Sequence, residues 1–244
     1  MSKMFKLVAV VGGLALSATA VGARADLVQN GSFETTTGTG SGQMGQYTDA
    51  TGWVTSGYNF IFTPGSADTT GVQSTFGNLQ LWGPNNGGDV SNTLPASSPD
   101  GGNYIGADGA YDVGAITQTI NGLVAGRQYS VGFYWAGAQQ SGFNGVTTEQ
   151  WLVSLGSQTQ ATAIVTDVSH GFTGWTHTTF TFTADGSSDV LSFLAAGTPN
   201  GEPPFSLLDG VTMTAVPEPA SMTLMGTGLA ALGFIRRRRT RHNR

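Results

Sequence analysis

The sequence predicts an all-β fold, a sandwich or a barrel built from short antiparallel strands. Segments in which apolar and polar residues alternate recur through the middle of the 244-residue chain. Turn signals such as Asn121-Gly122 and Asp185-Gly186 separate these segments. No helical periodicity lies between them, and many strands without intervening helices form sandwiches or barrels.

The clearest strand signal is Arg127–Trp135, in which Tyr129, Val131, Phe133 and Trp135 share one face. We interpret seven further segments as strands: Tyr58–Phe62, Asn78–Trp82, Ala115–Ile120, Glu149–Leu155, Thr176–Thr183, Val190–Leu194 and Leu207–Met213. In the threonine-rich segment, Phe180 and Phe182 lie on the same side. We therefore expect Trp135 and Phe180 to belong to the core.

The first 25 residues have the three parts of a signal peptide. Lys3 and Lys6 make the start positive, and an apolar run of about ten residues follows. Ala23 and Ala25 fit the small-x-small cleavage rule, so we expect export by the Sec machinery and a mature chain that begins at Asp26.

The C-terminal tail, residues 216–244, has a distinctive order of parts. It opens with Val216, Pro217, Glu218 and Pro219, continues with the uncharged run Ala220–Ile235, and reaches a basic cluster of Arg236, Arg237, Arg238 and Arg239. The prolines end the preceding strand and keep the segment extended. A helix of sixteen residues spans roughly 24 Å, so we expect a short membrane helix with its arginines on the cytoplasmic side.

This tail resembles the PEP-CTERM sorting signal of Gram-negative bacteria. Pro217-Glu218-Pro219 matches the motif, Ala220–Ile235 the membrane segment and Arg236–Arg239 the basic end. The resemblance implies recognition by an exosortase-type membrane protease, cleavage near the motif, and delivery to the cell surface or exopolysaccharide. The alternative is a plain C-terminal anchor. The chain then divides into a signal peptide (1–25), one β-sandwich domain (26–215) and the tail (216–244).

The body between the two targeting segments is strongly acidic. From Asp26 to Pro219 the only Lys or Arg is Arg127, and one cation against fifteen acids gives a net charge of −14. Such a body does not attract nucleic acid or an anionic membrane surface through charge. The chain has no cysteine, so an exported fold must be held by its core or by a metal.

Three pieces of the body are similar to galactose-binding-like jelly rolls, a fold that includes many carbohydrate-binding modules. Leu27–Glu34 is similar to their opening strand, Gln118–Trp135 to their middle, and Leu207–Met213 to their closing strand. The resemblance implies a two-sheet antiparallel jelly-roll sandwich. It allows sugar or exopolysaccharide binding without establishing it, since the fold hosts many functions.

The sequence favours a binding or structural role over catalysis. It has no G-x-S-x-G or H-E-x-x-H motif, and the body has only His170 and His177. Gly40–Gly45 fits G-x-G-x-x-G by letter but follows threonines, so we interpret it as a flexible loop. We expect a non-catalytic carbohydrate-binding module. The alternatives are a structural matrix or biofilm protein and, more remotely, a glycoside hydrolase.

Aromatic side chains among polar residues are the candidate ligand-binding groups, because sugar rings present C–H faces that stack on flat side chains. Trp82 leads, since a polar Gly- and Asn-rich loop follows it. Our candidates are Trp82, Trp53, Tyr58, Asn85 and Asn86.

We also expect a structural Ca²⁺ ion bound by Glu34 and Asp209. Asp209 shares parity with Leu207, Val211 and Met213, so its carboxylate should point toward the core. A charge there is costly unless it is paired or binds a metal, and calcium prefers carboxylate and carbonyl oxygens. The alternative is that loop amides donate hydrogen bonds to Asp209.

Overall fold

In the computed structural model, residues 25–217 are described and fold entirely as strands, turns and loops, without a helix in that range. The strands are β1 (Gly42–Gln43), β2 (Val54–Thr55), β3 (Asn59–Phe62), β4 (Val72–Ser74), β5 (Gly77–Leu79), β6 (Tyr104–Asp108), β7 (Ile116–Asn121), β8 (Gln128–Gln139), β9 (Thr147–Leu155), β10 (Gln158–Ala161), β11 (Val165–Asp167), β12 (Thr176–Thr183), β13 (Ser188–Thr198) and β14 (Pro204–Ala215). The predicted all-β class is confirmed.

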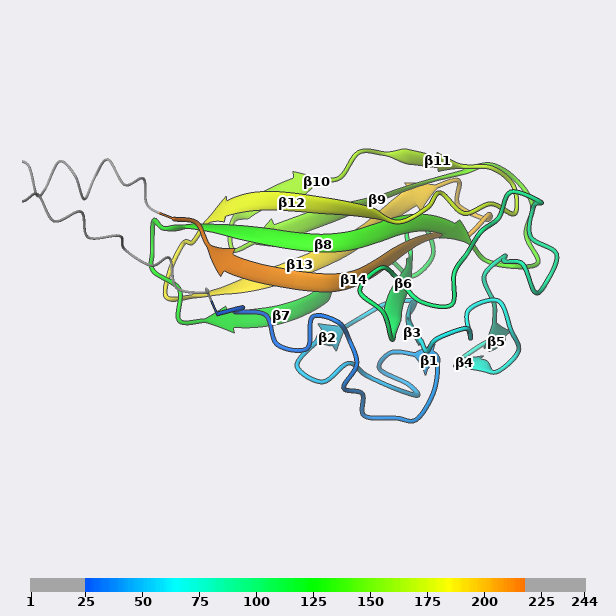
Figure 1. Ribbon diagram of the computed structural model, residues 1–244, viewed down its shortest axis with the longest axis horizontal. Helices are drawn as coiled ribbons and strands as arrows, with labels where there is room; N and C mark the ends of the chain where they lie inside the picture. The colour runs from blue at the N-terminus through cyan, green and yellow to red at the C-terminus, as the bar shows by residue number, and fades with distance from the viewer. Residues whose placement is uncertain (1–24, 218–244) are drawn as a thin grey trace, which may run out of the picture.

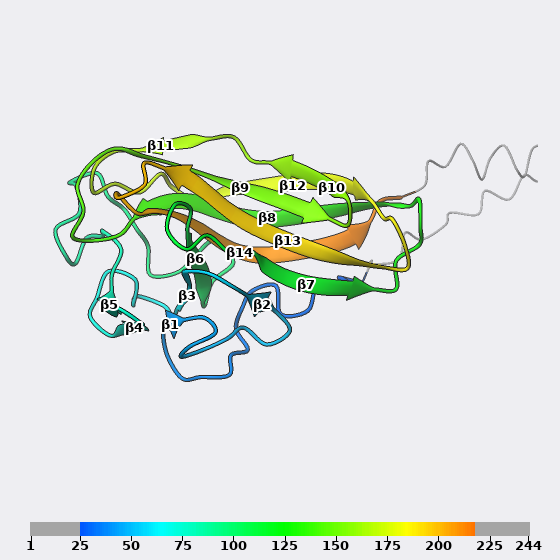
Figure 2. The same cartoon turned by 180° about the vertical axis from the view of Figure 1, so that it is seen from behind.

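Two sheets pack face to face (Figures 1 and 2). The eight-stranded sheet has the order β12-β8-β14-β6-β3-β1-β4-β5, and the six-stranded sheet has the order β10-β9-β13-β7-β2 with β11 paired to β9. All pairings are antiparallel except that of β1 with β4. From β6 onward the chain crosses repeatedly from one sheet to the other: β6, β8, β12 and β14 belong to the eight-stranded sheet, and β7, β9 and β13 to the six-stranded one. The exceptions are β10 and β11, which follow β9 in the same sheet. This alternation is the predicted jelly-roll sandwich.

The inner core lies between the two sheets. Every second residue of β9 is buried, and Tyr129, Val131, Phe133 and Trp135 of β8 are all buried as their alternation predicts. In β12, however, the expectation that Phe180 belongs to the core is only partly met. Phe182 is fully buried, whereas Phe180 is only partly buried and packs against the edge of the inner core beside Phe133.

A second apolar layer, the outer core, covers the opposite face of the eight-stranded sheet. It contains Tyr58, Phe60, Phe62, Ala67, Val72, Leu79, Leu81, Leu94, Tyr104, Ala136, Ala138, Phe205 and Leu207. Most of these residues lie between Tyr58 and Tyr104, a region in which the sequence predicted only the strands Tyr58–Phe62 and Asn78–Trp82. Gly42 and Gln43, which we expected in a flexible loop, instead form β1 and are buried.

A β-bulge in β14 overturns the predicted parity of Asp209. The pairing of β14 with β8 shifts between Asp209 and Thr212, and Gly210 has a left-handed φ of 58°. Leu207 therefore belongs to the outer core, whereas Val211 and Met213 belong to the inner core. Asp209 pairs with Tyr134 and lies on the outer face, where the loop that carries Ser98 and Asp100 buries it.

The segment Leu27–Glu34 is not a strand, contrary to its resemblance to an opening strand. It lies beside the end of β14, because the N–H of Leu27 donates to the Met213 carbonyl at 2.9 Å and the Val211 N–H donates to the Gly31 carbonyl at 3.0 Å. Left-handed φ angles at Asn30 and Phe33 bend it out of regular pairing.

The two ends of the body leave the sandwich at the same end (Figure 1). Within residues 25–217 no helix is both long and apolar enough to cross a membrane. Several predicted features lie outside the described residues: the signal peptide up to Arg24, Glu218 and Pro219 of the motif, the run Ala220–Ile235 and the arginine cluster.

Candidate functional site

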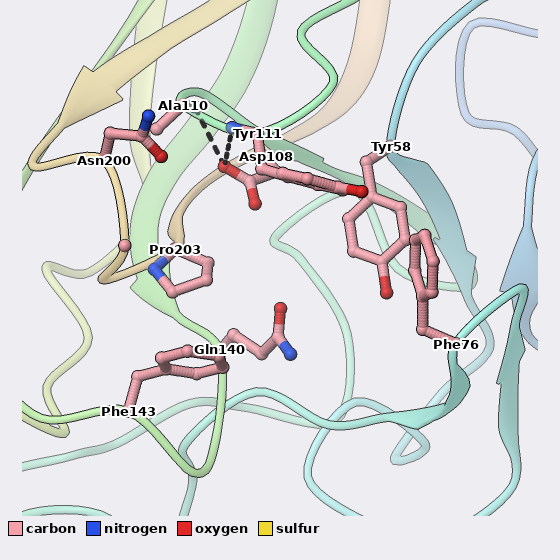
Figure 3. A pocket seen from close by; sticks show the side chains of 10 residues that line it. Tyr58, Phe76, Asp108, Ala110, Tyr111, Gln140, Phe143, Asn200 and Pro203 are labelled. Carbon is pink, nitrogen blue, oxygen red and sulfur yellow. Dashed lines mark hydrogen bonds between the residues drawn. The ribbon is translucent and has the colours of Figure 1, made fainter.

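A pocket of about 300 Å³ is shown in Figure 3. The loops that line it lie at the end of the sandwich opposite the termini (Figure 1). We call it the Asp108 pocket. Its lining comes from the residue before β3, the end of β6 and the loops after β4, β6, β8 and β13. It comprises Tyr58, Phe76, Asp108, Ala110, Tyr111, Gln140, Phe143, Asn200, Gly201 and Pro203. Segments far apart in the sequence therefore meet at one site.

Three aromatic rings form one wall of the pocket. Tyr58 is buried and holds the other two in place, with ring centroids 5.6 Å from Tyr111 and 5.9 Å from Phe76. Tyr111 is 48% exposed and Phe76 is 70% exposed. Phe143, on the far side, is also exposed (Figure 3). Flat apolar surfaces that remain in contact with water suit the C–H faces of a ligand.

Asp108 supplies the charge of the pocket. One carboxylate oxygen accepts the N–H groups of Ala110 at 2.8 Å and Tyr111 at 3.1 Å, while the other oxygen is buried and has no partner. That second oxygen points into the pocket (Figure 3). Burial raises the pKa of Asp108 to about 6, although the two N–H groups lower it in part.

Amide side chains complete the polar lining. Gln140 directly follows β8, and its backbone N–H donates to the Pro203 carbonyl at 3.2 Å, which joins two walls of the pocket and leaves the side-chain amide free to face the ligand. Asn200 lies on the loop between β13 and β14 and faces the same space (Figure 3). An amide both donates and accepts, so these groups can match hydroxyls of either role.

The predicted ligand residues divide among three places. Tyr58 lines the Asp108 pocket. Trp82 lies beside it, because its indole N–H donates to the Phe143 carbonyl at 2.9 Å and its ring stacks on His170 at a centroid distance of 4.0 Å. Trp53 lies in the inner core, only 5% exposed between Phe33 and Phe193. A ring packed on both sides offers no face to a sugar, so Trp53 is a core residue and not a ligand-binding one.

Asn85 and Asn86 shape the loop after Trp82. The Asn85 side chain donates to Asp68 at 3.1 Å. Asn86 donates to the Leu81 carbonyl at 2.7 Å and accepts the Gly83 N–H at 2.9 Å. Both the NH₂ and the carbonyl oxygen of the Asn86 side chain are therefore hydrogen-bonded within its own loop. Neither Asn85 nor Asn86 lines the Asp108 pocket.

The predicted metal residues Glu34 and Asp209 lie near each other, together with Asp100. Glu34 accepts the Asn103 N–H at 2.7 Å, and Asp209 accepts the Ser98 hydroxyl while its other oxygen is buried without a partner. Burial raises the pKa of Asp209 to about 8, and the charges of Asp100 and Glu34 add to that rise. Among residues 25–217, however, no three carboxylate or imidazole groups form a ready metal cluster.

The sequence reasoning missed Phe76, Asp108, Gln140 and Phe143 as site residues. Two of them carried a signal. Phe76 and Phe143 each lie in a short run of Gly, Ser, Thr or Asn, where an apolar core residue is out of place. Asp108 ends a strand whose five residues are all buried, so no alternation marked it.

At the C-terminal end, residues 215–239 match the PEP-CTERM protein-sorting motif. The chain carries a PEP-CTERM sorting motif. This confirms the resemblance that rested on Pro217-Glu218-Pro219 and the arginine cluster. The motif covers the tail alone.

The body has distant likenesses. Halomucin of Haloquadratum walsbyi is 26% identical over 219 residues, which is 87% of this chain and only 2% of that protein. The family 61 module TmCBM61, solved with β-1,4-galactotriose, aligns with a TM-score of 0.39 at 15% identity over 79% of this chain and 99% of its own.

Two further structures are similar to the same extent. The CBM22-1 xylan-binding domain of Paenibacillus barcinonensis Xyn10C has a TM-score of 0.37 at 14% identity, covering 82% of this chain and 100% of that one. The enzymatically active domain of bacteriophage CBA120 tailspike protein 4 has a TM-score of 0.36 at 17% identity, covering 78% and 21%. All three TM-scores lie below 0.5.

Proposed function

We propose that this protein is an exported, non-catalytic module that binds a neutral carbohydrate in the Asp108 pocket. One observation carries the proposal: exposed Phe76, Tyr111 and Phe143 converge on a single buried carboxylate at one end of the sandwich. A purely structural matrix protein has no need to hold three large rings in water around a polar pocket.

The lining matches the two surfaces of a sugar. A pyranose ring presents C–H faces to Tyr111 and Phe76, while its hydroxyls exchange hydrogen bonds with Gln140 and Asn200 beside the buried carboxylate of Asp108. The volume of about 300 Å³ lies at the lower end of the range for small-molecule sites. The pocket therefore suits a short stretch or an end of a glycan.

The charge of the body narrows the ligand class. The described residues contain fourteen acids and a single Lys or Arg, Arg127, which lies at the other end of β8 from the pocket. Anionic polysaccharides would meet repulsion in such a field. Neutral glycans would not.

The pocket lining favours binding over hydrolysis. Canonical glycoside hydrolysis uses two carboxyl groups on opposite sides of the scissile bond. Among the described residues that line the pocket, Asp108 is the only acid. A ligand held there would be bound without being cut.

The sorting motif supports the second half of the proposal, which concerns location. An exosortase-type protease would recognise Pro217-Glu218-Pro219 after Sec-dependent export, and processing would release the body to the outer surface or extracellular matrix of a Gram-negative bacterium. A module that binds glycan would then attach the protein to exopolysaccharide.

A glycan array with the purified protein tests the ligand, followed by titration of the best neutral glycan. Tyr111→Ala and Phe76→Ala should each weaken binding at least tenfold, a loss of about 1.4 kcal/mol. Tyr47→Ala is the matched control, because Tyr47 is 46% exposed and lies outside the pocket lining. Absence of binding to any glycan would instead favour the structural role, and equal losses in all three variants would place the ligand elsewhere.

We further propose that Glu34 and Asp209 hold a structural Ca²⁺ ion. The buried, unpartnered oxygen of Asp209 and the nearby carboxylates fit a hard cation, with backbone carbonyls or water as the remaining ligands. A cation bound only by the folded state raises the melting temperature by mass action. Millimolar calcium should therefore raise it relative to EDTA, by less in Asp209→Asn than in the parent. Equal shifts in the two proteins would exclude this site.

A further inference from the structure

Two acids on the neighbouring strands β9 and β11 face the interior of the sandwich. Glu149 pairs with Val165, and Asp167 pairs with Thr147, so the two carboxyl groups are diagonal neighbours on one face of the sheet. Glu149 is 0% exposed and Asp167 is 2% exposed. The pair lies between the sheets, away from Asp209, which lies on the outer face of the other sheet.

Three of the four carboxylate oxygens of this pair have no hydrogen-bond partner. Both oxygens of Glu149 and Oδ2 of Asp167 are buried and unpartnered. The Thr147 hydroxyl is near enough to lower the pKa of Glu149 in part, but its geometry falls short of a hydrogen bond. Bare buried carboxylate oxygens are costly, and native folds rarely tolerate them without a partner.

Glycines on the surrounding elements make the space these carboxylates occupy. A Cβ at Gly137 of β8, across the sandwich, would lie 2.6 Å from Oε2 of Glu149. A Cβ at Gly171 would lie 2.2 Å from Oδ1 of Asp167. Any residue other than glycine at either position would push into the carboxylates.

No protein cation among residues 25–217 neutralises the pair. Arg127, the only Lys or Arg in that range, precedes β8, ten residues before Gly137 and so roughly 33 Å along the strand. The nearby amide of Gln139 donates instead to the Thr147 hydroxyl at 2.9 Å and to the Val168 carbonyl at 2.9 Å. Residues 25–217 therefore offer these acids no charged partner.

We propose that Glu149 and Asp167 bind a hard divalent cation, Ca²⁺, in the interior of the sandwich. Calcium takes six to eight oxygen ligands, and the carboxylates can supply up to four, with nearby hydroxyl, carbonyl and water oxygens for the rest. The ion ties β11 to β9 and fixes the segment from Asp167 to His170, whose backbone supports the loop beside Trp82 and the Asp108 pocket.

The alternative to a bound cation is that Glu149 and Asp167 are protonated. In the absence of a cation, desolvation raises the pKa of Glu149 to about 8 and that of Asp167 to about 7. The pair could then remain protonated at neutral pH. A protonated carboxyl would still need an acceptor for its O–H, and neither oxygen of Glu149 has a hydrogen-bond partner. A cation satisfies all the bare oxygens together.

The Glu149→Gln variant separates the two possibilities, because glutamine imitates the protonated acid and cannot replace the charged one. Calcium bound per chain is measured by equilibrium dialysis and elemental analysis. We expect Glu149→Gln and Asp167→Asn each to lose one calcium per chain relative to the parent, whereas the exposed control Asp112→Asn loses none. Asp209→Asn reports on the other proposed ion independently, so failure of one site is distinguishable from failure of the other.

Two further readouts keep the result decisive. In EDTA, Glu149→Gln should melt at or above the parent temperature, which shows that it folds; in millimolar calcium it should melt below the parent. Tb³⁺, used in place of calcium, should luminesce through Trp151, two residues from Glu149 on the same face of β9, and lose that emission in Glu149→Gln. Unchanged calcium content, or a variant that melts at or above the parent in calcium as well, would overturn the proposal.

Discussion

At the scale of single residues, the buried carboxylate of Asp108 lowers the free energy of unfolding when it is charged. Its pKa is raised from 3.8 to about 6 because burial disfavours the charged form. The folded protein therefore holds this proton up to about pH 6, while the unfolded chain releases it near 3.8. The free energy of unfolding falls as pH rises through this window, and the cost is complete above it.

Replacing Asp108 by Asn should remove this cost. The stability of Asp108→Asn relative to the parent should rise between pH 4 and pH 7, by at most roughly 3 kcal/mol for a shift of about two pKa units. Urea unfolding of both proteins at pH 4, 5.5 and 7 measures the difference. Asp112→Asn, which removes an exposed carboxylate, is the control. A stability gap for Asp108→Asn that stays constant with pH would contradict the assignment.

The degree of burial also predicts how much three aromatic residues of the inner core contribute to stability. Trp135→Ala and Phe182→Ala should each lower the free energy of unfolding by about 3–5 kcal/mol, because both side chains are almost wholly enclosed. Phe180→Ala should cost clearly less, since water already reaches part of that ring. Chemical denaturation of the three variants tests the order. A loss at Phe180 equal to that at Phe182 would show that the edge of the sandwich is more tightly closed than its exposure indicates.

At the scale of elements, the bulge in β14 decides which layer each side chain enters. Before Gly210 the strand sends Leu207 to the outer core and Leu208 to the inner core. After the extra residue, Val211 and Met213 face the inner core. The bulge at Gly210 therefore reverses the parity of the strand, so that Asp209 lies on the outer face although Val211 and Met213 lie on the inner one.

Gly210→Ala should weaken the fold for two separable reasons. The left-handed φ of 58° costs about 1–2 kcal/mol for a residue with a Cβ, and that Cβ would lie 3.0 Å from Tyr134 and 3.1 Å from Asp100. Gly122→Ala is the matched control, since its φ is 79° and no atom lies within 4 Å of the added Cβ. Thermal melts should show a larger loss for Gly210→Ala. Equal losses would mean that the bulge has room to relax.

The same elements show what a sequence can reveal. β8, β9 and β12 were predictable because each is long and alternates between a buried and a wetter face. β6 was not, since its five residues are all buried between the inner and outer cores. The pocket was predictable only at Tyr58, because Phe76, Phe143 and Asn200 meet through the tertiary fold and no spacing in the chain brings them together. Parity misplaced Asp209 because nothing in a linear pattern marks a bulge.

At the scale of the whole molecule, the first residue of the expected mature chain already takes part in the fold. The carboxylate of Asp26 accepts the N–H of Val28 at 3.0 Å and that of Met213 at 2.8 Å, so it joins the start of the body to its last strand. Asp26 can make these contacts whether or not residues precede it.

The intact mass of protein recovered from the cell surface or medium tests both processing events. We expect a chain that begins at Asp26 and has lost Arg236–Arg239, because the body ends at β14 and the sorting motif follows directly. The same measurement in a strain without exosortase should give a heavier species that retains the arginines. Retention of the arginines in a strain with an active exosortase would contradict the C-terminal part of this prediction.

The placement of the termini and the pocket at opposite ends has a mechanical consequence. β14 begins directly after Pro203, which lines the pocket, and runs the length of the sandwich to the tail. A pull between a captured glycan and the tail would act along β14, which is hydrogen-bonded to β8 on one side and β6 on the other. Such a load shears many hydrogen bonds at once instead of unzipping them one by one, so the body is built to bear tension along the axis on which its ligand would pull.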